Sequence, residues 1–459
     1  MTTAKPTTCR WMWIAVFAWI AFLLLSLKTG WLNNFYFDTS HTSTPGMDYF
    51  SVVRGWLNLR NGISEFDTFH STYGPYASPL NYHPLLAVVV GAPMMFFSPW
   101  TGYAVWAVLS AGLLALSAWI IARRSSHPSQ RPAVMLLVAG SFPAFILFQS
   151  GNVQALLVLA MAMIFTAMED LRETPGKPIA LVMLLAGLLI SLFSKPTVLA
   201  LVPLLLLIKE TRRTTVIALA TYVPVSFLSL TWHAWNPIAL TWHDRWLWMT
   251  HPNAIAQTMN EYTNHFTVTR PMMDNAIHWF NMVGLTDFRF LHIDIYSLSA
   301  LMDGWLGTHT PDALYRVPML LVVEVSLLVA LIRDRRAKLE AALMVTAASS
   351  LLLILSYGVV WEYHYTLVLL VTALLVVRRS TDILERIALA LGLLAWLPSM
   401  FFFFRNDNMS SLHVQTILRT ERVVPVAIMF LLLLTRAVIL ALRNPEGLRF
   451  LSRSANAAA

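Results

Sequence analysis

Apolar runs close to the thickness of a lipid bilayer recur along the whole chain. Trp11 to Leu27, Val134 to Phe148 and Val423 to Leu434 are examples, and a helix of about 20 apolar residues crosses the hydrocarbon core. Of the 459 residues, 57% are apolar and 12% are charged, against roughly 25% charged in soluble domains. The sequence therefore predicts an all-α polytopic membrane protein, with residues 1–459 forming a single transmembrane domain.

Short basic connectors separate the apolar runs and fix the expected orientation of the helices. They lie at residues 123–124, 172–177, 209–213, 333–338, 378–379 and around 443. Cytoplasmic loops carry an excess of Lys and Arg, so we place these connectors and both termini in the cytoplasm. About twelve transmembrane helices follow, over residues 11–27, 101–122, 132–149, 151–168, 179–194, 196–208, 214–231, 315–332, 341–357, 364–377, 387–404 and 423–441. The formal charge of +8 is spread over the connectors, which argues against a nucleic-acid-binding patch.

Two polar segments are left on the outer face, and both are much longer than ordinary connectors. The first outer loop covers residues 28–100 and the second covers residues 232–314. The apolar run from Pro84 to Ser98 is short, and a crossing there would move the basic pair at 123–124 to the outside. We therefore expect a helix lying at the membrane interface. Loops of this size usually carry function.

Asp48 is the first candidate catalytic residue, because it lies where the chain leaves the bilayer after the first helix. A carboxylate held there can accept the proton of a hydroxyl group while that hydroxyl attacks an activated carbon. Alternatively, Asp48 only caps the helix that follows it. Asp38, Glu65 and Asp67 are rival carboxylates in the same loop.

Lys195 is the second candidate, at the outer tip of an apolar hairpin that Pro196 interrupts. A cation buried at that depth needs an anion or water, and a lipid-linked phosphate would supply the anion. Alternatively, the lysine extends toward the lipid headgroups. Arg270, Arg54 and His265 are further candidates for contacting a phosphate, although such residues are more often solvated.

Two more outer turns carry polar side chains. The turn from Trp361 to Tyr365 includes His364, which could bind a phosphate or position an acceptor, although aromatic residues are usual at any membrane interface. Gln149, Asn152 and Gln154 could hydrogen-bond a polar ligand at the same depth, or could hold helices together.

The sequence has no Walker loop, Rossmann glycine pattern, His-Glu-x-x-His or Gly-x-Ser-x-Gly motif. The energy for a group transfer would then come from the substrate itself. A sugar linked to a lipid phosphate satisfies this condition, because it lies in the membrane and carries its own leaving group. The single cysteine, Cys9, excludes an intramolecular disulfide.

Five short motifs follow one another along the chain. They are Asp48-Tyr49 with Gly62, Tyr82-His83-Pro84, Ser150-Gly151-Asn152-Val153-Gln154, Ser194-Lys195-Pro196-Thr197 and Trp361-Glu362-Tyr363-His364. On these motifs the chain resembles the GT-C superfamily of membrane glycosyltransferases. It most closely resembles glycosyltransferase family 87, the polyprenol-phosphate-mannose-dependent α-mannosyltransferases. That family usually has Tyr-Pro-Pro at the second motif and Gly-Gln-x-Asn at the third.

The resemblance implies a GT-C fold in the bacterial inner membrane, with an active site facing the periplasm. It implies inverting transfer of a sugar, mannose before arabinose, from a polyprenyl phosphate to a lipid or polysaccharide acceptor. No cofactor would be obligatory, and a divalent metal is left open. Asp48 would be the catalytic base, and Lys195, Arg270 and His364 would hold the donor phosphate. The substrate-binding residues would be Tyr49, Arg54, Asn152, Gln154, Glu362 and His265.

Two other classes stay open. A secondary transporter or lipid flippase is also a helical bundle with intramembrane polar residues, but the polar residues here gather at outer turns. An O-antigen polymerase or ligase shares the large outer loops, and Arg245, Arg270 and Arg289 suit that class.

Overall fold

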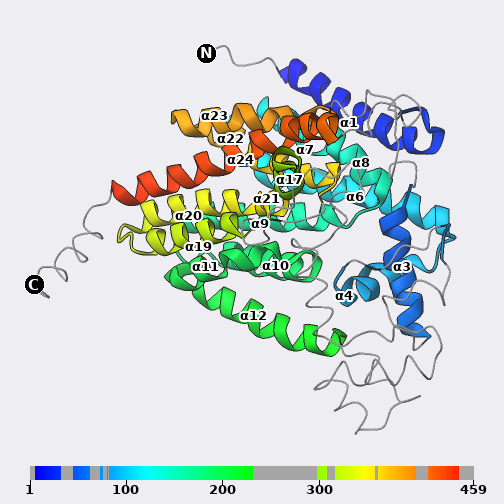
Figure 1. The fold of residues 1–459 in the computed structure, drawn as a ribbon, viewed down its shortest axis with the longest axis horizontal. Coiled ribbons are helices and arrows are strands. Elements are labelled where there is room, and N and C mark those ends of the chain that lie inside the picture. The colour runs from blue at the N-terminus through cyan, green and yellow to red at the C-terminus, as the bar shows by residue number, and fades with distance from the viewer. Residues whose placement is uncertain are drawn as a thin grey trace, which may run out of the picture.

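The computed structural model of the protein is a bundle of helices (Figure 1). It describes residues 6–32, 45–61, 73–75, 80, 82–230, 297–307, 316–356, 360–399 and 412–443, and these contain no strand. The helices are α1 (Pro6–Thr29), α3 (Met47–Arg60), α4 (Pro84–Leu86), η1 (Ala87–Gly91), α5 (Ala92–Met94), α6 (Pro99–Ala122), α7 (Gln130–Ala139), α8 (Phe142–Ser150), α9 (Gln154–Glu173), α10 (Pro178–Ser194), η2 (Pro196–Leu201), α11 (Val202–Leu207), α12 (Lys209–Leu230), α17 (Leu298–Leu306), α19 (Val317–Ala330), α20 (Arg335–Ser350), α21 (Leu352–Leu355), η4 (Glu362–Tyr365), α22 (Thr366–Arg378), α23 (Ile383–Leu393), η5 (Leu394–Trp396) and α24 (Leu412–Leu442). The expected all-α fold is confirmed.

Several helices are long and apolar enough to cross a membrane. Within the described residues, α1, α6, α9, α20 together with α21, and α24 meet this criterion, and α7 with α8 meets it as one span bent by 44°. The segments α10, α19, 84–94 and 198–207 are apolar but shorter. Long apolar helices indicate an integral membrane protein. Its orientation and the full set of about twelve crossings stay predictions.

Each predicted span coincides, within the described residues, with one helix or with a helix that is broken along its length. The break between α7 and α8 has a local cause. The Ser141 side chain accepts a hydrogen bond from the Ala144 N–H, and Pro143 occupies the first turn of α8. Both features start a new helix, and the apolar pattern alone does not reveal them.

A network of ion pairs joins the basic connectors at one end of the bundle. Arg124 contacts Glu169 and Asp170, while Arg378 contacts Glu169 and Glu340. The network also contains the pairs Arg172–Glu340, Lys177–Asp170, Arg378–Glu385, Arg436–Asp382 and Arg436–Glu385, and hydrogen bonds from Arg335 to the carbonyls of Leu171 and Arg172. The connectors at 123–124, 172–177, 333–338 and 378–379 therefore meet at the same end, as a common cytoplasmic location requires.

The helices that leave this network meet again at the opposite end. The central helix α9 packs against α6, α10 and α20, and its 20 residues span about 30 Å. Helix α10 begins after Lys177 and ends before Lys195, while α22 ends at Arg378 and begins after η4. Three of the predicted outer turns, at Gln154, Lys195 and η4, are thus brought to the far end of the bundle. Figure 1 shows α3 and α4 at that end, on the right of the view.

A second, smaller core forms between α3, the segment 84–94 and the start of α6. It contains Tyr49, Phe50, Val52 and Val53 from α3. Gly91 lets the two segments come close, because an added Cβ there would lie 2.7 Å from the Val52 carbonyl oxygen. Val89 and Phe96 on the other side are 60% and 90% exposed, which suits the predicted interfacial helix.

Candidate functional site

Asp48 lies in the first turn of α3, and the start of this helix is held against the turn between α8 and α9. The Gly46 N–H donates to the Gln149 carbonyl oxygen at 2.7 Å. Gly151, in the left-handed conformation with φ +68°, lies so close to α3 that an added Cβ would come within 2.6 Å of the Tyr49 Cβ. These contacts place the Asp48 carboxylate beside the residues that follow Gly151.

Asn152 fixes the position of the Asp48 carboxylate. Its Nδ2 donates to Asp48 Oδ2 at 2.7 Å and to the Tyr82 hydroxyl at 2.6 Å. Its Oδ1 accepts from the Gln154 backbone N–H at 2.8 Å, which sets the orientation of the amide. The N-cap of α3 is Gly46, and the half-buried Asp48 carboxylate instead accepts a hydrogen bond from a distant turn. Asp48 therefore does more than cap its own helix.

Lys195 lies at the break between α10 and η2, where its own backbone is extended (φ −144°) and Pro196 starts the next helix. Its side chain is 6% exposed and reaches η4. Lys195 Nζ lies 2.7 Å from His364 Nε2 and 5.5 Å from the centre of the Tyr363 ring. The predicted donor-phosphate residues Lys195 and His364 are therefore direct neighbours.

Asp48, Tyr82, Asn152, Lys195 and His364, here called the Asp48 cluster, are also connected electrostatically. Burial lowers the pKa of Lys195 to about 7, although the charge of Asp48 favours the protonated lysine. Burial and the charge of Asp48 raise the pKa of Tyr82 well above its usual value. The cluster thus joins a carboxylate, an amine of perturbed pKa, a neutral phenol and an imidazole at one end of the bundle. Such a combination is typical of a catalytic site.

Two buried glutamines flank the turn that carries Asn152. Gln149 is the last residue but one of α8 and Gln154 begins α9, and both side chains are at most 1% exposed. None of their side-chain amide atoms has a hydrogen-bond partner within the described part of the chain. An unpaired buried amide costs about 1–3 kcal/mol. A ligand with hydroxyl groups would satisfy these atoms.

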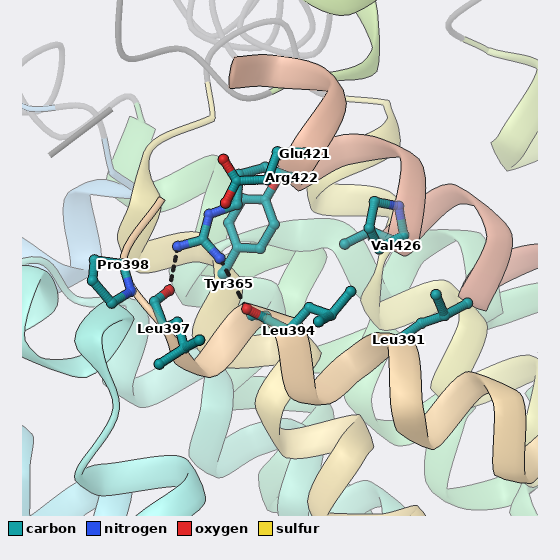
Figure 2. Close-up of a pocket in the computed structure, with 10 residues that line it drawn as sticks. Tyr365, Leu391, Leu394, Leu397, Pro398, Glu421, Arg422 and Val426 are labelled. Carbon is teal, nitrogen blue, oxygen red and sulfur yellow. Dashed lines mark hydrogen bonds between the residues drawn. The ribbon is translucent and has the colours of Figure 1, made fainter. Parts of the chain in front are cut away.

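Glu362 forms an ion pair with Arg422 of α24. Both side chains are at most 3% exposed. Arg422 also donates to the carbonyls of Leu394 and Leu397, as Figure 2 shows, and it lines a cavity of about 260 Å³ between η5 and α24. The ion pair thus ties η4, which carries His364, to α24 and to the end of α23.

The remaining predicted residues divide into two groups. Tyr49 is buried in an aromatic group with Phe50, Tyr73 and Tyr103, and Arg54 is buried on the same helix, so their roles in substrate binding stay predictions. The residues that lie outside the described part of the chain are His265, Arg270, the rival carboxylates Asp38, Glu65 and Asp67, and Arg245 and Arg289 of the polymerase reading.

Two residues of this region were missing from the predicted site. Tyr82 belongs to a quoted motif, but only the fold brings its hydroxyl to Asn152. Arg422 starts an apolar run at the end of the bundle opposite the basic connectors. An arginine at such a position is itself the signal that could have identified a buried partner.

The comparisons with known proteins concern the middle of the chain. The family model of glycosyltransferase family 87 matches residues 81–356, more than half of the sequence. The match includes Tyr82, Asn152 and Lys195, whereas Asp48 and His364 lie outside it. The chain matches no curated protein and no solved structure.

Proposed function

The chain belongs to glycosyltransferase family 87, and from this premise we propose which sugar transfer it performs. The donor is a sugar, mannose first, linked to polyprenyl phosphate. The acceptor is a hydroxyl group of a glycolipid or polysaccharide at the outer face of the membrane. One observation carries the proposal. Asp48 is hydrogen-bonded to Asn152 in the turn after α8, and this turn lies at the same end of the bundle as Lys195 and His364.

Asp48 acts as the general base in this proposal. The carboxylate removes the proton of the acceptor hydroxyl while the oxygen forms a bond to the anomeric carbon. The bond from that carbon to the phosphate oxygen breaks, and its electron pair leaves with the polyprenyl phosphate. Attack from the face opposite the leaving group inverts the anomeric configuration.

Lys195 and His364 contact the departing phosphate in this proposal. A protonated Lys195 stabilises the negative charge that grows on the leaving oxygen. Arg270 remains a proposed third phosphate ligand, and His265 a proposed substrate ligand.

The sugar hydroxyls are the proposed partners of the unpaired glutamine amides. Gln154 lies two residues after Asn152, and Gln149 three residues before it. Both amides are buried next to the turn that holds the base, so hydroxyl groups there would remove the cost of leaving them unpaired.

We propose that no metal is obligatory, because the leaving group is already an anion and Lys195 can supply the opposing charge. Transfer should therefore keep its rate after divalent metals are removed with EDTA. A loss of more than tenfold that Mg²⁺ or Mn²⁺ restores would contradict this part of the proposal.

The proposed topology is that of a GT-C enzyme in a bacterial inner membrane, with about twelve crossings. The Asp48 cluster faces the periplasm, and the ion-pair network and both termini lie in the cytoplasm. The gathering of four basic connectors at the end opposite the cluster supports this orientation.

The test is transfer from a panel of radiolabelled polyprenyl-phosphate sugars, including mannose and arabinose, to membrane lipids by the purified full chain in liposomes. We expect product from one donor, and a loss of about 10²–10⁴-fold in Asp48→Asn. The control is Asp334→Asn, a carboxylate that caps α20 at the other end of the bundle, which should keep full activity. Full activity in a folded Asp48→Asn would show that Asp48 is not the general base. The absence of product from every donor would favour a transporter or a polymerase using diphosphate-linked oligosaccharides.

A further inference from the structure

The two ring nitrogens of His364 have different partners, and these fix where its proton lies. The Trp361 backbone N–H points at His364 Nδ1 at 2.8 Å. A backbone N–H can only donate, so Nδ1 must be the acceptor nitrogen of the imidazole. A neutral imidazole then carries its hydrogen on Nε2. Both residues belong to the same turn around η4, so this contact is local and does not depend on distant packing.

The hydrogen on Nε2 determines the state of Lys195. Nε2 lies 2.7 Å from Lys195 Nζ, and an N–H at that position donates. An ammonium group has three donors and no acceptor, whereas an uncharged amine has a lone pair. The contact is therefore a hydrogen bond only if Nζ is uncharged. A charged Lys195 could only donate, so Nε2 of His364 would have to accept. A neutral imidazole has one acceptor nitrogen, and here that nitrogen is Nδ1, which accepts from Trp361.

The surroundings of Nζ agree with this state. In the described part of the chain, the titratable groups around the pair include Asp48 from α3 and Tyr363 beside His364 on η4, and Tyr82 before α4 interacts with both of these. Asp48 alone among these carries a negative charge at neutral pH, and burial outweighs it and lowers the pKa of Lys195 to about 7.

We propose that above about pH 7.5 Lys195 is an uncharged amine before the donor binds, and that binding of a lipid phosphate is accompanied by the uptake of one proton from solvent onto Lys195 Nζ. The identity of the ligand rests on the proposed function. In the bound state, Nζ carries a hydrogen that points at the phosphate, and the Nε2–H of His364 turns to a second phosphate oxygen. In this pH range the cation thus forms together with its anion, which spares the donor-free protein the cost of a buried charge.

The experiment measures proton uptake directly. The purified full chain in nanodiscs is titrated calorimetrically with a short-chain prenyl methyl phosphate, a phosphodiester that does not itself titrate between pH 6 and 9. Two buffers of different ionisation enthalpy at pH 8.5 give the number of protons bound. We expect about one proton per ligand, and a dissociation constant that rises about tenfold per pH unit above pH 7.5.

Lys195→Arg is the diagnostic variant, because a guanidinium stays protonated. It should bind without proton uptake and without the pH dependence. Lys177→Arg, at the ion-pair network, is the matched control and should behave like the unaltered protein.

Each other outcome is decisive. If the unaltered protein binds the ligand without proton uptake and with an affinity that does not change with pH, Lys195 is always protonated. That result overturns the inference and leaves the proposed donor class intact. If Lys195→Arg still takes up a proton on binding, the proton goes to another group, and the inference is again overturned. No binding at any pH contradicts the proposed donor class itself. The unaltered protein alone decides the first question, so a misfolded variant does not leave it open.

Discussion

At the scale of single residues, Asn152 matters because it is the donor that holds Asp48 in place. Asn152→Asp would put a second carboxylate against the first, and like charges disfavour ionisation. The base then needs a higher pH to lose its proton, so the acidic limb of the pH–rate profile should move to higher pH. The rate of sugar transfer between pH 5 and 8 measures this shift.

Asn152→Ala is the control for that change, because it removes the hydrogen bond without adding charge. It should lower the rate while moving the acidic limb much less. An unchanged profile in Asn152→Asp would mean that Asp48 does not titrate in the step that limits the rate.

The sequence predicted the members of the cluster better than their contacts. Asp48, Asn152, Lys195 and His364 are each predicted because they lie where an apolar run ends at an expected outer turn, and Lys195 also because a buried cation needs a partner. The partners themselves come from turns far apart in the chain, such as Lys195 and His364 at a separation of 169 residues. No local pattern encodes such a pair.

At the scale of elements, the turn between α8 and α9 places α3. Gly151→Ala would force an alanine into φ +68° and drive its Cβ to within 2.6 Å of Tyr49. Backbone strain of this kind costs about 1–3 kcal/mol, and the clash should also displace Asp48. We expect a lower midpoint of thermal unfolding together with a reduced turnover rate.

Gly176→Ala is a matched control, since Gly176 has the same φ of +68° with no atom within 4 Å of an added Cβ. Gly176→Ala should lower the midpoint of thermal unfolding through the same backbone strain, but should leave the turnover rate unchanged. Equal activity in the two variants would argue that contact between Gly151 and α3 does not position the base.

The ion pair of Glu362 and Arg422 holds η4 against α24. Arg422→Met would leave the buried Glu362 carboxyl without its partner and should lower the free energy of unfolding by about 3–5 kcal/mol. The double variant Arg422→Met with Glu362→Gln should recover much of this stability. Burial raises the pKa of Glu362 to about 7 even beside Arg422, so the folded single variant binds a proton more readily than the unfolded chain.

Relative to the unaltered protein, the stability of Arg422→Met should therefore rise as the pH falls from about 9 to about 7 and change little below that, because Glu362 of the unaltered protein also takes up a proton near pH 7. Thermal unfolding at several pH values checks this. A variant whose stability does not depend on pH relative to the parent would show that Glu362 stays charged through another contact.

Helix positions were predicted more completely than helix breaks. The apolar runs located nearly every helix because hydropathy averages over many residues. The break at Ser141 and Pro143, and the partner of Arg422, depend on single side chains that such an average hides.

At the scale of the whole molecule, the Asp48 cluster and the ion-pair network should lie on opposite sides of the membrane. Replacing Cys9, the single cysteine, by serine gives a background in which single cysteines can be added. In intact cells, Arg60→Cys at the exposed end of α3 should react with an impermeant maleimide. Thr174→Cys beside the network should react only after the membrane is opened.

If Thr174→Cys reacted in intact cells and Arg60→Cys reacted only after the membrane was opened, the proposed orientation would have to be inverted. Equal labelling of both positions in intact cells would contradict the two-sided arrangement itself.

The shortness of some helices has a consequence for biosynthesis. Helix α8 has nine residues and α11 has six, far fewer than the roughly 20 that stay in the bilayer alone. Neither can be released into the lipid as it emerges from the ribosome. The segment before each of them, α7 or η2, has to wait in the translocation channel until α8 or α11 has followed, and the two pieces then enter together as one broken span. A nascent chain arrested between the two pieces of such a span should thus remain at the channel, even though the helices before it are already in the membrane.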